Sequence, residues 1–575
     1  MKLALKLLQK MIVLPSEDAG ETRRLLDDLG LEVKDVSEDS RGVVFTIETL
    51  ANRGDHLSAL GVAREVAART LAGVKHPPVV AALPQKKAVF SLRRETDRCL
   101  RYALLEAEIS PDMKLRPDVG SLLESADALH PLVSILNYVQ AEVGQPMHAF
   151  DRDKIDGEII INLTTQEEKI EALDGKSYMV PVDSVVIRDR SKIVAVAGVI
   201  GCANSMVTDS TTRVVIESAL FEPVSVRKTA RKMGLVTEAA YAFERGVDPD
   251  GWLLGLKRAG HLLTGLGGGA ADPSNHLIGF STASEIKVEL PVIEVPLAFI
   301  RTQLGMPRLE EVQISSRLKH LGYSVEVLSA TKNKEVLRVV APAWRVWDVS
   351  SLDDVLEDLA RSIGYSQIKL ELPPLDYAIP ELNDRERITS QLEPVLLGNG
   401  FLEVITKSFY SAKEAQLVEE YSAGKLPPHL TLKNSLESSY SHLKATNLVH
   451  AALMTEQNFR RGVQSIKAFE FGQLFGRDRG HDEEYPHESA CLTLWQAGRW
   501  MAGEWRQPEK REQRVASFVG LFEQLFAALR APVTIVDGDH PLLHPGCQGE
   551  FRVGRKVCGF FGLIHPGLQL SLIHI

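Results

Sequence analysis

The residues best suited to chemistry lie in two short runs far apart in the chain. In the first, Gly-Gln-Pro-Met-His-Ala-Phe-Asp at 144–151, His148 stands beside a proline turn, where an imidazole could polarise water or hold a ligand. In the second, at 237–249, small residues alternate with polar ones before a Glu-Arg-Gly turn, a pattern suited to a tight wall followed by a charged corner. A lone histidine is more often structural, and Thr237 alone would be read as a helix N-cap. Each run by itself therefore predicts little.

A second group of candidate residues is acidic: Asp348, Asp354, Glu357 and Asp358. If Ser351 begins a helix, the last three lie at i, i+3 and i+4 on one face, where like charges repel unless a cation or an arginine lies between them. The alternative is a solvated acidic first turn, which the helix dipole favours. The spacing leaves both interpretations open.

Composition limits the class of protein. A chain of 575 residues is too long for one hydrophobic core, so about three to five domains are expected. The net charge of −10 argues against nonspecific coating of nucleic acid, so any RNA contact would be local or shared with another subunit. The five cysteines include no C-x-x-C pair, which favours reduced thiols in a cytoplasm and no zinc site. The longest apolar run, 193–203, is far shorter than the roughly 20 residues of a membrane helix.

Hydrophobic periodicity predicts an α+β protein of several domains. The first ten residues have the pattern of an amphipathic helix, and 273–285 reads as a linker. From 286 to 368 the pattern predicts strand, helix, helix, strand and helix, and a long helix is expected to lead into Gly400. The other expected strands are 43–48, 184–187, 193–197, 214–217 and 336–340, and the other expected helices are 61–68 and 449–459.

The two opening runs together resemble the editing domain of the bacterial phenylalanyl-tRNA synthetase beta subunit. Further matches to that family are 52–58, Trp344-Arg345, 353–365, 544–546 and 562–567. The resemblance implies four regions: a small N-terminal α/β domain at 1–85, a tRNA-editing domain at 86–280, a small DNA-binding-like domain at 286–368, and a class II synthetase-like core, an antiparallel sheet with helices, at 369–575. The family's OB-fold insertion is expected to be absent between Val36 and Val43. Its C-terminal ferredoxin-like anticodon-binding domain is also expected to be missing, by reduction or truncation.

The resemblance also implies a site that hydrolyses tyrosine wrongly esterified to the phenylalanine tRNA. Glu217 would accept a hydrogen bond from the tyrosine hydroxyl, Thr237 and Ala239 would set the pocket's size, and His148 would orient the ester or its attacking water. A site that hydrogen-bonds a hydroxyl rejects the analogue lacking it far better than an apolar pocket rejects an added hydroxyl. Without the resemblance, Glu217 would be interpreted as a strand-end carboxylate in a salt bridge. The implied pocket residues are Asn137, His148, Ala197, Gly198, Glu217, Thr237 and Ala239.

Two departures from the family pattern put binding of the tRNA 3′ end in question. The approach to the pocket is shortened to 128–132, around His130, and a usual Gly-Gly is Gly201-Cys202.

As a beta subunit, the chain would work in the cytoplasm in an alpha2-beta2 tetramer that uses ATP, phenylalanine and the phenylalanine tRNA. Synthesis would occur on the alpha subunit, since 432–448 offers no ATP-gripping arginine, only Lys433 and Lys444. In the family, the positions of Asp348, Asp354, Glu357 and Asp358 match a Mg²⁺ site shared with alpha. The alternatives are a free-standing aminoacyl-tRNA deacylase and a non-catalytic RNA-binding scaffold.

Overall fold

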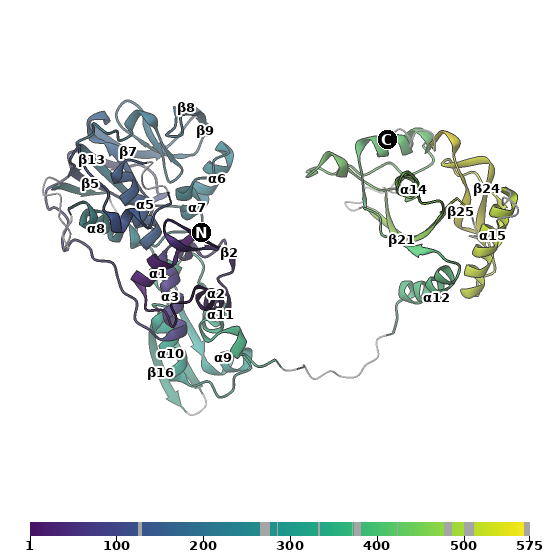
Figure 1. The fold of residues 1–575 in the computed structure, drawn as a ribbon, viewed down its shortest axis with the longest axis horizontal. Helices are drawn as coiled ribbons and strands as arrows, with labels where there is room; N and C mark the ends of the chain where they lie inside the picture. Colours follow the sequence, from purple (N-terminus) through teal and green to yellow (C-terminus); the bar gives the residue numbers. More distant parts are fainter. Residues whose placement is uncertain are drawn as a thin grey trace. The chain divides into compact units, whose positions relative to one another are not determined.

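The computed structural model divides the chain into two compact units, Met1–Pro373 and Pro374–Ile575 (Figure 1). The residues that the structure describes are 1–124, 129–264, 276–283, 286–331, 334–370, 372, 381–422, 424–476, 486–498 and 511–568. Both units mix helices with sheets, so the prediction of a mixed α and β protein is confirmed. No helix in these described ranges has the length and apolarity needed to cross a bilayer.

The N-terminal part of the first unit is a three-stranded sheet with helices. Its strands are β1 (Lys2–Ala4), β2 (Val33–Asp39) and β3 (Gly42–Ile47), and its helices are α1 (Leu5–Met11), α2 (Ala19–Asp28) and α3 (Ala59–Thr70). The prediction of a helix from residue 1 is wrong at its start, because Lys2 pairs with Thr46 and the next two residues are buried in strand β1. Asp39 pairs with Gly42 across a tight turn, so β2 and β3 have no inserted domain between them, as expected.

Two stacked sheets form the upper part of this unit in Figure 1. The antiparallel sheet β14-β5-β13-β6 consists of β5 (Cys99–Glu108), β6 (Met147–Asp151), β13 (Arg213–Phe221) and β14 (His276–Thr282). The second sheet, β12-β11-β10-β7-β4, consists of β4 (Ser91–Arg94), β7 (Glu158–Leu163), β10 (Val185–Arg188), β11 (Ile193–Val196) and β12 (Ile200–Gly201). A small hairpin of β8 (Glu168–Glu171) and β9 (Ser177–Val180) and the helices α6 (Pro223–Met233) and α7 (Glu238–Phe243) adjoin them.

The sheet that contains β13 is covered on both faces. On one face, Val214 and Ile216 pack with helices α5 (Pro131–Val143) and α8 (Gly251–Thr264). On the other face, Val215 and Ala219 pack with the strands of the second sheet. Because both faces are buried, the strand reads as a continuous apolar run, and this is why periodicity predicted it correctly.

Strand β14 corrects the predicted linker at 273–285. Its residues pair with β5 from His276 opposite Glu108 to Thr282 opposite Ala103. The segment resembled a linker because it is an edge strand with Gly279 at its centre, where a Cβ atom would lie 2.8 Å from the backbone of Ala88. Residues 273–275, 284 and 285 of the predicted linker lie outside the described residues.

The last part of the first unit has one strand more than predicted. Its elements are β15 (Val292–Pro296), α9 (Leu297–Gln303), α10 (Glu311–His320), β16 (Ser324–Thr331), β17 (Lys334–Val340) and α11 (Leu352–Ile363), and its sheet has the order β15-β17-β16. Strand β16 escaped prediction because it lies at the sheet edge and none of the side chains at 324–328 is fully buried.

The second unit contains two three-stranded sheets and a short strand pair. Its strands are β18 (Leu402–Glu403), β19 (Phe409–Tyr410), β20 (His442–Leu443), β21 (Ile466–Gly476), β22 (His487–Ala497), β23 (Thr534–Asp537), β24 (Leu543–Val553) and β25 (Lys556–Ile564). Its helices are α12 (Asp384–Gly398), α13 (Ala412–Ser422), α14 (Leu448–Arg460) and α15 (Arg511–Ala528). The predicted helices before Gly400 and at 449–459 are confirmed. The expected antiparallel sheet includes one parallel pair, β18 with β21.

Candidate functional site

A pocket opens between the two stacked sheets of the first unit. It is lined by Pro146, Met147, His148, Ile187, Ala195, Val196, Gly198, Val199, Ile200, Gly201, Glu217, Phe221, Ala239 and Phe243. Only His148 and Glu217 among these residues carry ionisable side chains. The pocket therefore has an apolar wall with two polar groups, the composition expected of a site for a small, largely apolar group.

His148 and Glu217 are direct cross-strand neighbours, paired between β6 and β13. Both point to the face of the sheet that meets the second sheet; Glu217 is buried, and His148 is half-buried with its Nε2 atom enclosed. His148 also meets Phe150 edge-on, with ring centroids 4.7 Å apart. Neither His148 Nε2 nor Glu217 Oε2 has a hydrogen-bond partner within the described part of the chain. Buried polar atoms are nearly always bonded, so these two atoms are positioned to receive a ligand or water.

Burial shifts the pKa of both groups toward neutrality at pH 7. It lowers the pKa of His148 to about 4 and raises the pKa of Glu217 to about 8, although the neighbouring Tyr102 hydroxyl opposes the second shift. A neutral imidazole can accept a proton from water, and a carboxyl group can accept a hydrogen bond from a ligand hydroxyl in either protonation state. The pair is therefore suited to hydrolysis of a substrate that presents a hydroxyl.

Two glycines let the pocket wall approach the sheet. A Cβ atom on Gly201 would lie 2.5 Å from His148 Cε1, and one on Gly198 would lie 2.9 Å from the Phe243 ring. Gly198 also has φ +66°, which side chains rarely tolerate. Gly201 therefore permits the close approach of His148, whose ring occupies the space that a larger residue at 201 would need.

The other expected pocket residues differ in position. Ala239 lines the pocket, whereas Thr237 caps α7: its hydroxyl accepts from Ala240 N at 3.1 Å and donates to Val199 O at 2.8 Å. Ala197 is buried next to the lining residues. Asn137 is exposed on α5 and does not line the pocket. Of the seven expected residues, His148, Gly198, Glu217 and Ala239 line the pocket. Ala197 and Thr237 lie next to the lining residues, and Asn137 lies outside the pocket.

Glu217 does not have the salt bridge that was considered as its alternative. It lies in the middle of β13 and forms no ion pair with a described residue. Tyr102, which the sequence interpretation passed over, lies on the neighbouring strand β5, where Ala219 is its direct partner and Glu217 is diagonal to it. The alternation of side chains along β5 could have predicted this neighbour, because Tyr102 and Leu104 lie on the same face of the sheet as Glu217.

His130 and Cys202, which belong to the two departures from the family pattern, do not line the pocket. His130 is the N-cap of α5, its Nδ1 accepting from Leu132 N at 3.2 Å. Cys202 is buried but is not a lining residue, and burial raises the pKa of its thiol to about 12. Ala128, part of the shortened approach, lies outside the described residues.

The four acidic residues expected to hold Mg²⁺ do not converge on one point. Asp348 and Asp358 both pair with the buried guanidinium of Arg345, and Asp358 also accepts from the Tyr323 hydroxyl at 2.6 Å. Asp354 caps its own helix by accepting from the backbone N–H groups of Ser350 and Ser351. Glu357 lies 3.7 Å from Arg361.

In this chain by itself the four carboxylates do not gather around one point, and the Mg²⁺ site shared with an alpha subunit stays a prediction. Mg²⁺ needs several oxygens in octahedral geometry, and at least one oxygen of each of Asp348, Asp354 and Asp358 is already bonded to Arg345 or to backbone N–H groups. Helical spacing placed Asp354, Glu357 and Asp358 correctly on α11. It could not show that arginines would separate their charges.

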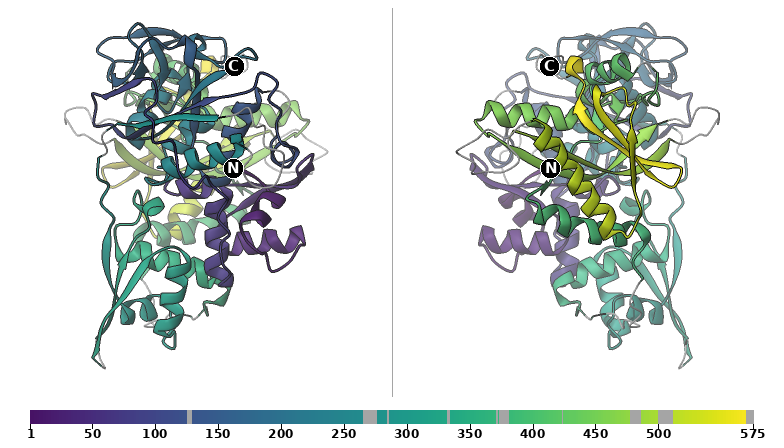
Figure 2. Two further views of the ribbon diagram at one scale, coloured as in Figure 1. Left: turned by 90° about the vertical axis from the view of Figure 1, so that its left-hand side faces the viewer. Right: turned by 90° about the vertical axis from the view of Figure 1, so that its right-hand side faces the viewer.

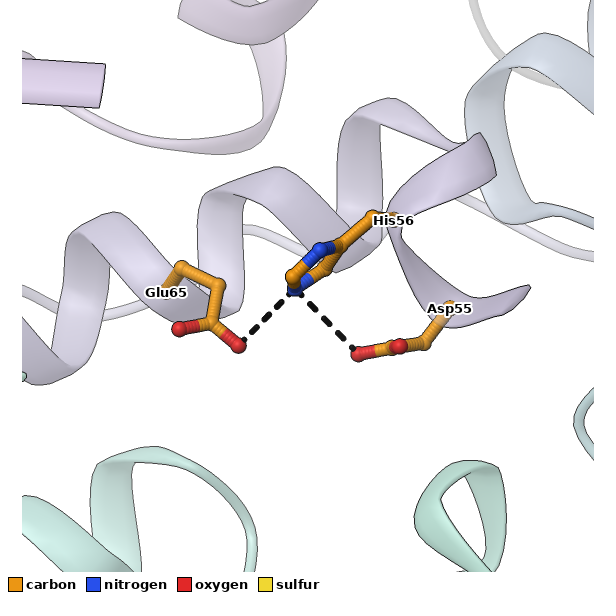
Figure 3. A group of neighbouring side chains, drawn as sticks. All are labelled: Asp55, His56 and Glu65. Carbon is orange, nitrogen blue, oxygen red and sulfur yellow. Dashed lines mark hydrogen bonds and ion pairs between the residues drawn. The ribbon is translucent and has the colours of Figure 1, made fainter. Parts of the chain in front are cut away.

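A different cluster, Asp55, His56 and Glu65, does bring its ligand atoms together (Figure 3). His56 Nε2 lies 3.1 Å from Glu65 and 3.8 Å from Asp55. The Arg53 guanidinium, almost wholly buried, donates hydrogen bonds to both carboxylates. Arg53 is therefore the cation of this cluster, and the group is best explained as a buried ion-pair network joining the N-terminal part to α11 through Arg361 and Glu65.

Selectivity for a hydroxyl is expected to rise with pH. Glu217 is mostly neutral at pH 7 and ionises as pH passes about 8, and a carboxylate accepts a stronger hydrogen bond than a neutral carboxyl group. The groups facing it do not titrate in this range: the His148 pKa is about 4, and burial raises the pKa values of Tyr102 and Cys99 above their usual ranges.

The measurement is the ratio of hydrolysis rates for tyrosyl and phenylalanyl esters of the same tRNA from pH 6.5 to 9, after the spontaneous rate at each pH has been subtracted. We expect the ratio to climb severalfold in the wild type and to stay flat in Glu217→Gln. A rise of equal size in both proteins would mean that another group controls selectivity.

Comparison with known proteins gives three domain matches along the chain. Residues 124–268 match the B3/4 domain, residues 293–365 match the tRNA synthetase B5 domain, and residues 368–572 match the phenylalanyl tRNA synthetase beta chain CLM domain. The pocket residues His148, Glu217 and Ala239 lie within the first match.

Whole-chain comparison agrees with the domain matches. The Phenylalanine–tRNA ligase beta subunit of Legionella pneumophila (strain Lens) is 30% identical over 92% of this chain and 64% of that protein. The protein of the same description from Syntrophus aciditrophicus (strain SB) is 31% identical over 95% of this chain and 67% of its own length. The chain thus spans about two thirds of the length of these relatives. From the extent of this similarity, the chain belongs to the phenylalanine–tRNA ligase beta subunit family.

Proposed function

We propose that the pocket between the two sheets is an editing site that hydrolyses tyrosyl-tRNA formed in error. The observation that carries the proposal is the pair of unpartnered buried atoms, His148 Nε2 and Glu217 Oε2, in an otherwise apolar pocket. Glu217 accepts the hydrogen bond of the tyrosine hydroxyl, and neutral His148 orients the ester or the attacking water. Ala239 and the glycines leave room for the aromatic ring.

Glu217 would make the pocket selective against phenylalanine. If a phenylalanine ring entered, the buried carboxyl group would remain unpaired and the tyrosine hydrogen bond would be lost. That difference is about 1–3 kcal/mol, and more for an ionised acceptor. A correctly charged tRNA would therefore be hydrolysed more slowly.

The rest of the chain is proposed to act as a beta subunit in the cytoplasm, in an alpha2-beta2 tetramer that binds the phenylalanine tRNA. We assign this function to four parts of the chain: the N-terminal part at 1–85, the editing part at 86–280, the small domain at 286–368 and the class II-like core at 369–575. Phenylalanine, ATP and Mg²⁺ would be used at the synthetic site of the alpha subunit. In the second unit, Lys444 supports this division, since it is buried and its Nζ bonds Glu470 at 3.0 Å rather than facing a nucleotide.

We expect the purified chain alone to show no phenylalanine-dependent exchange of ATP with pyrophosphate, because its class II-like core lacks a free cation for the phosphates at 432–448 apart from the exposed Lys433. Co-expression with a candidate alpha subunit should give a complex of tetramer mass that exchanges pyrophosphate and charges the tRNA. Exchange by the chain without alpha would contradict the proposal. Deacylation by a chain that never binds alpha would favour a free-standing deacylase.

A further inference from the structure

Helix α6 carries an exposed basic face beside the pocket. The helix has no acidic residue in its first turn, and its exposed side chains include Arg227, Lys228, Arg231 and Lys232. None of these four forms an ion pair with a residue in the described ranges. Four unpaired cations on one helix face contrast with the net charge of −10 for the whole chain.

The opposite face of α6 is part of the pocket's support. Val226 is buried, and its side chain lies 3.2 Å from the position that a Cβ of Gly198 would occupy. The helix also packs against α7, which supplies Ala239, and against strand β9 of the β8–β9 hairpin, as the neighbouring labels in Figure 1 show. After α6 ends at Met233, the chain reaches the cap residue Thr237 within one short turn.

The β8–β9 hairpin connects this basic face to the pocket wall. Leu173, just after the end of strand β8, donates its backbone N–H to Gly201 O at 3.1 Å. Leu173 and Val236 are both exposed large apolar side chains, the latter 90% exposed. A positively charged surface follows the phosphate backbone of single-stranded nucleic acid, so the basic face of α6 is suited to contact its phosphates.

We propose that Arg227, Lys228, Arg231 and Lys232 bind the phosphates of a single-stranded RNA 3′ end as its esterified terminus enters the pocket. The inference rests on the proposed editing function, and it identifies the surface by which this chain holds the RNA. Because the rest of the chain is acidic and repels RNA, the basic face of α6 provides the electrostatic attraction that holds the RNA beside the pocket. Figure 2 gives two further views of the ribbon, coloured by position in the sequence.

The test compares two variants of the full chain in complex with alpha. Lys228→Ala/Lys232→Ala removes two cations at i and i+4 from the basic face, and alanine keeps the helix. The matched control, Lys86→Ala/Lys87→Ala, removes the same charge from exposed positions beside β14, at the edge of the sheet opposite β6. The readout is kcat/KM for tyrosyl-tRNA hydrolysis over a series of salt concentrations.

Each phosphate contact on a single strand contributes about 0.7 to the slope of log affinity against log salt. The α6 variant should therefore lose about 1.4 from the slope, so that between about 50 and 200 mM salt its kcat/KM falls roughly sevenfold less than that of the wild type. Hydrolysis of tyrosyl-adenosine, which has no phosphate, should be unchanged in this variant. The control should keep the wild-type slope.

An unchanged slope in the α6 variant would overturn the proposal, as would an equal change in the control, since that would show an effect of net charge alone. Slower hydrolysis of tyrosyl-adenosine by the α6 variant would also overturn it, because the substitution would then disturb the pocket. If the wild type leaves tyrosyl-tRNA intact, the proposed editing function fails. Binding of uncharged tRNA over the same salt series then decides separately whether α6 is an RNA surface.

Discussion

Glu217→Ala is expected to slow hydrolysis of tyrosyl-tRNA by about 10- to 100-fold in kcat/KM. The substitution removes the only acidic hydrogen-bond acceptor among the pocket's lining residues, and above pH 8, where Glu217 is mostly ionised, a hydrogen bond to such a charged group contributes about 1.5–3 kcal/mol. Aminoacylation by the complex should stay at the wild-type rate, because the synthetic site is proposed to lie on the alpha subunit. Both rates can be measured on one preparation of the complex.

Glu217→Gln is the matched control for shape. The amide keeps the volume of the side chain and one carbonyl acceptor but cannot ionise, so we expect a smaller loss than with alanine. Equal hydrolysis by the wild type and both variants would show that the tyrosine hydroxyl binds elsewhere. A loss of aminoacylation together with hydrolysis would instead show that the substitution damages the fold.

Arg345→Met is expected to destabilise the first unit by about 3–5 kcal/mol, because it leaves two buried carboxylates without their cation. Arg345 is 4% exposed and pairs with Asp348 at 2.9 Å and with Asp358, which is fully buried. Methionine keeps most of the apolar stem, so the loss reports mainly on charge. The measurement is the free energy of unfolding of the first unit in urea.

Arg338→Met, on strand β17 of the same unit, supplies the control. Arg338 is about half exposed and lies 3.7 Å from the exposed Glu326, and such surface pairs contribute about 0–1 kcal/mol. Comparison of the two substitutions separates the effect of losing the buried ion pairs of Arg345 from the effect of losing an arginine in general. Similar small losses for both would mean that Asp348 and Asp358 are neutral or solvated, and would reopen a cation site at these residues.

Sequence patterns predicted the elements that are buried on both sides. The strands at 193–197 and 214–217 were found because their apolar runs are continuous, and α14 was found from its helical spacing. Strands β14 and β16 were missed because each lies at a sheet edge, where few side chains are buried and the apolar signal is weak.

The candidate site depended on contacts that local patterns do not contain. Strand pairing sets His148 opposite Glu217, although 69 positions separate them, and only the family resemblance joined them in advance. Local spacing placed three of the acidic residues on one face of α11, but it could not show that Arg345, which lies before the helix, pairs with Asp358. Long-range partners of buried charges are fixed by tertiary packing, which a helix or strand period does not record.

The most direct test of the account is hydrolysis of tyrosyl-tRNA by the wild-type complex. The account predicts that tyrosyl-tRNA is deacylated at least tenfold faster than phenylalanyl-tRNA on the same tRNA at pH 8, where Glu217 is about half ionised. Equal rates for the two esters, or a tyrosyl ester that survives as long with the complex as without it, would contradict the claim that this pocket edits.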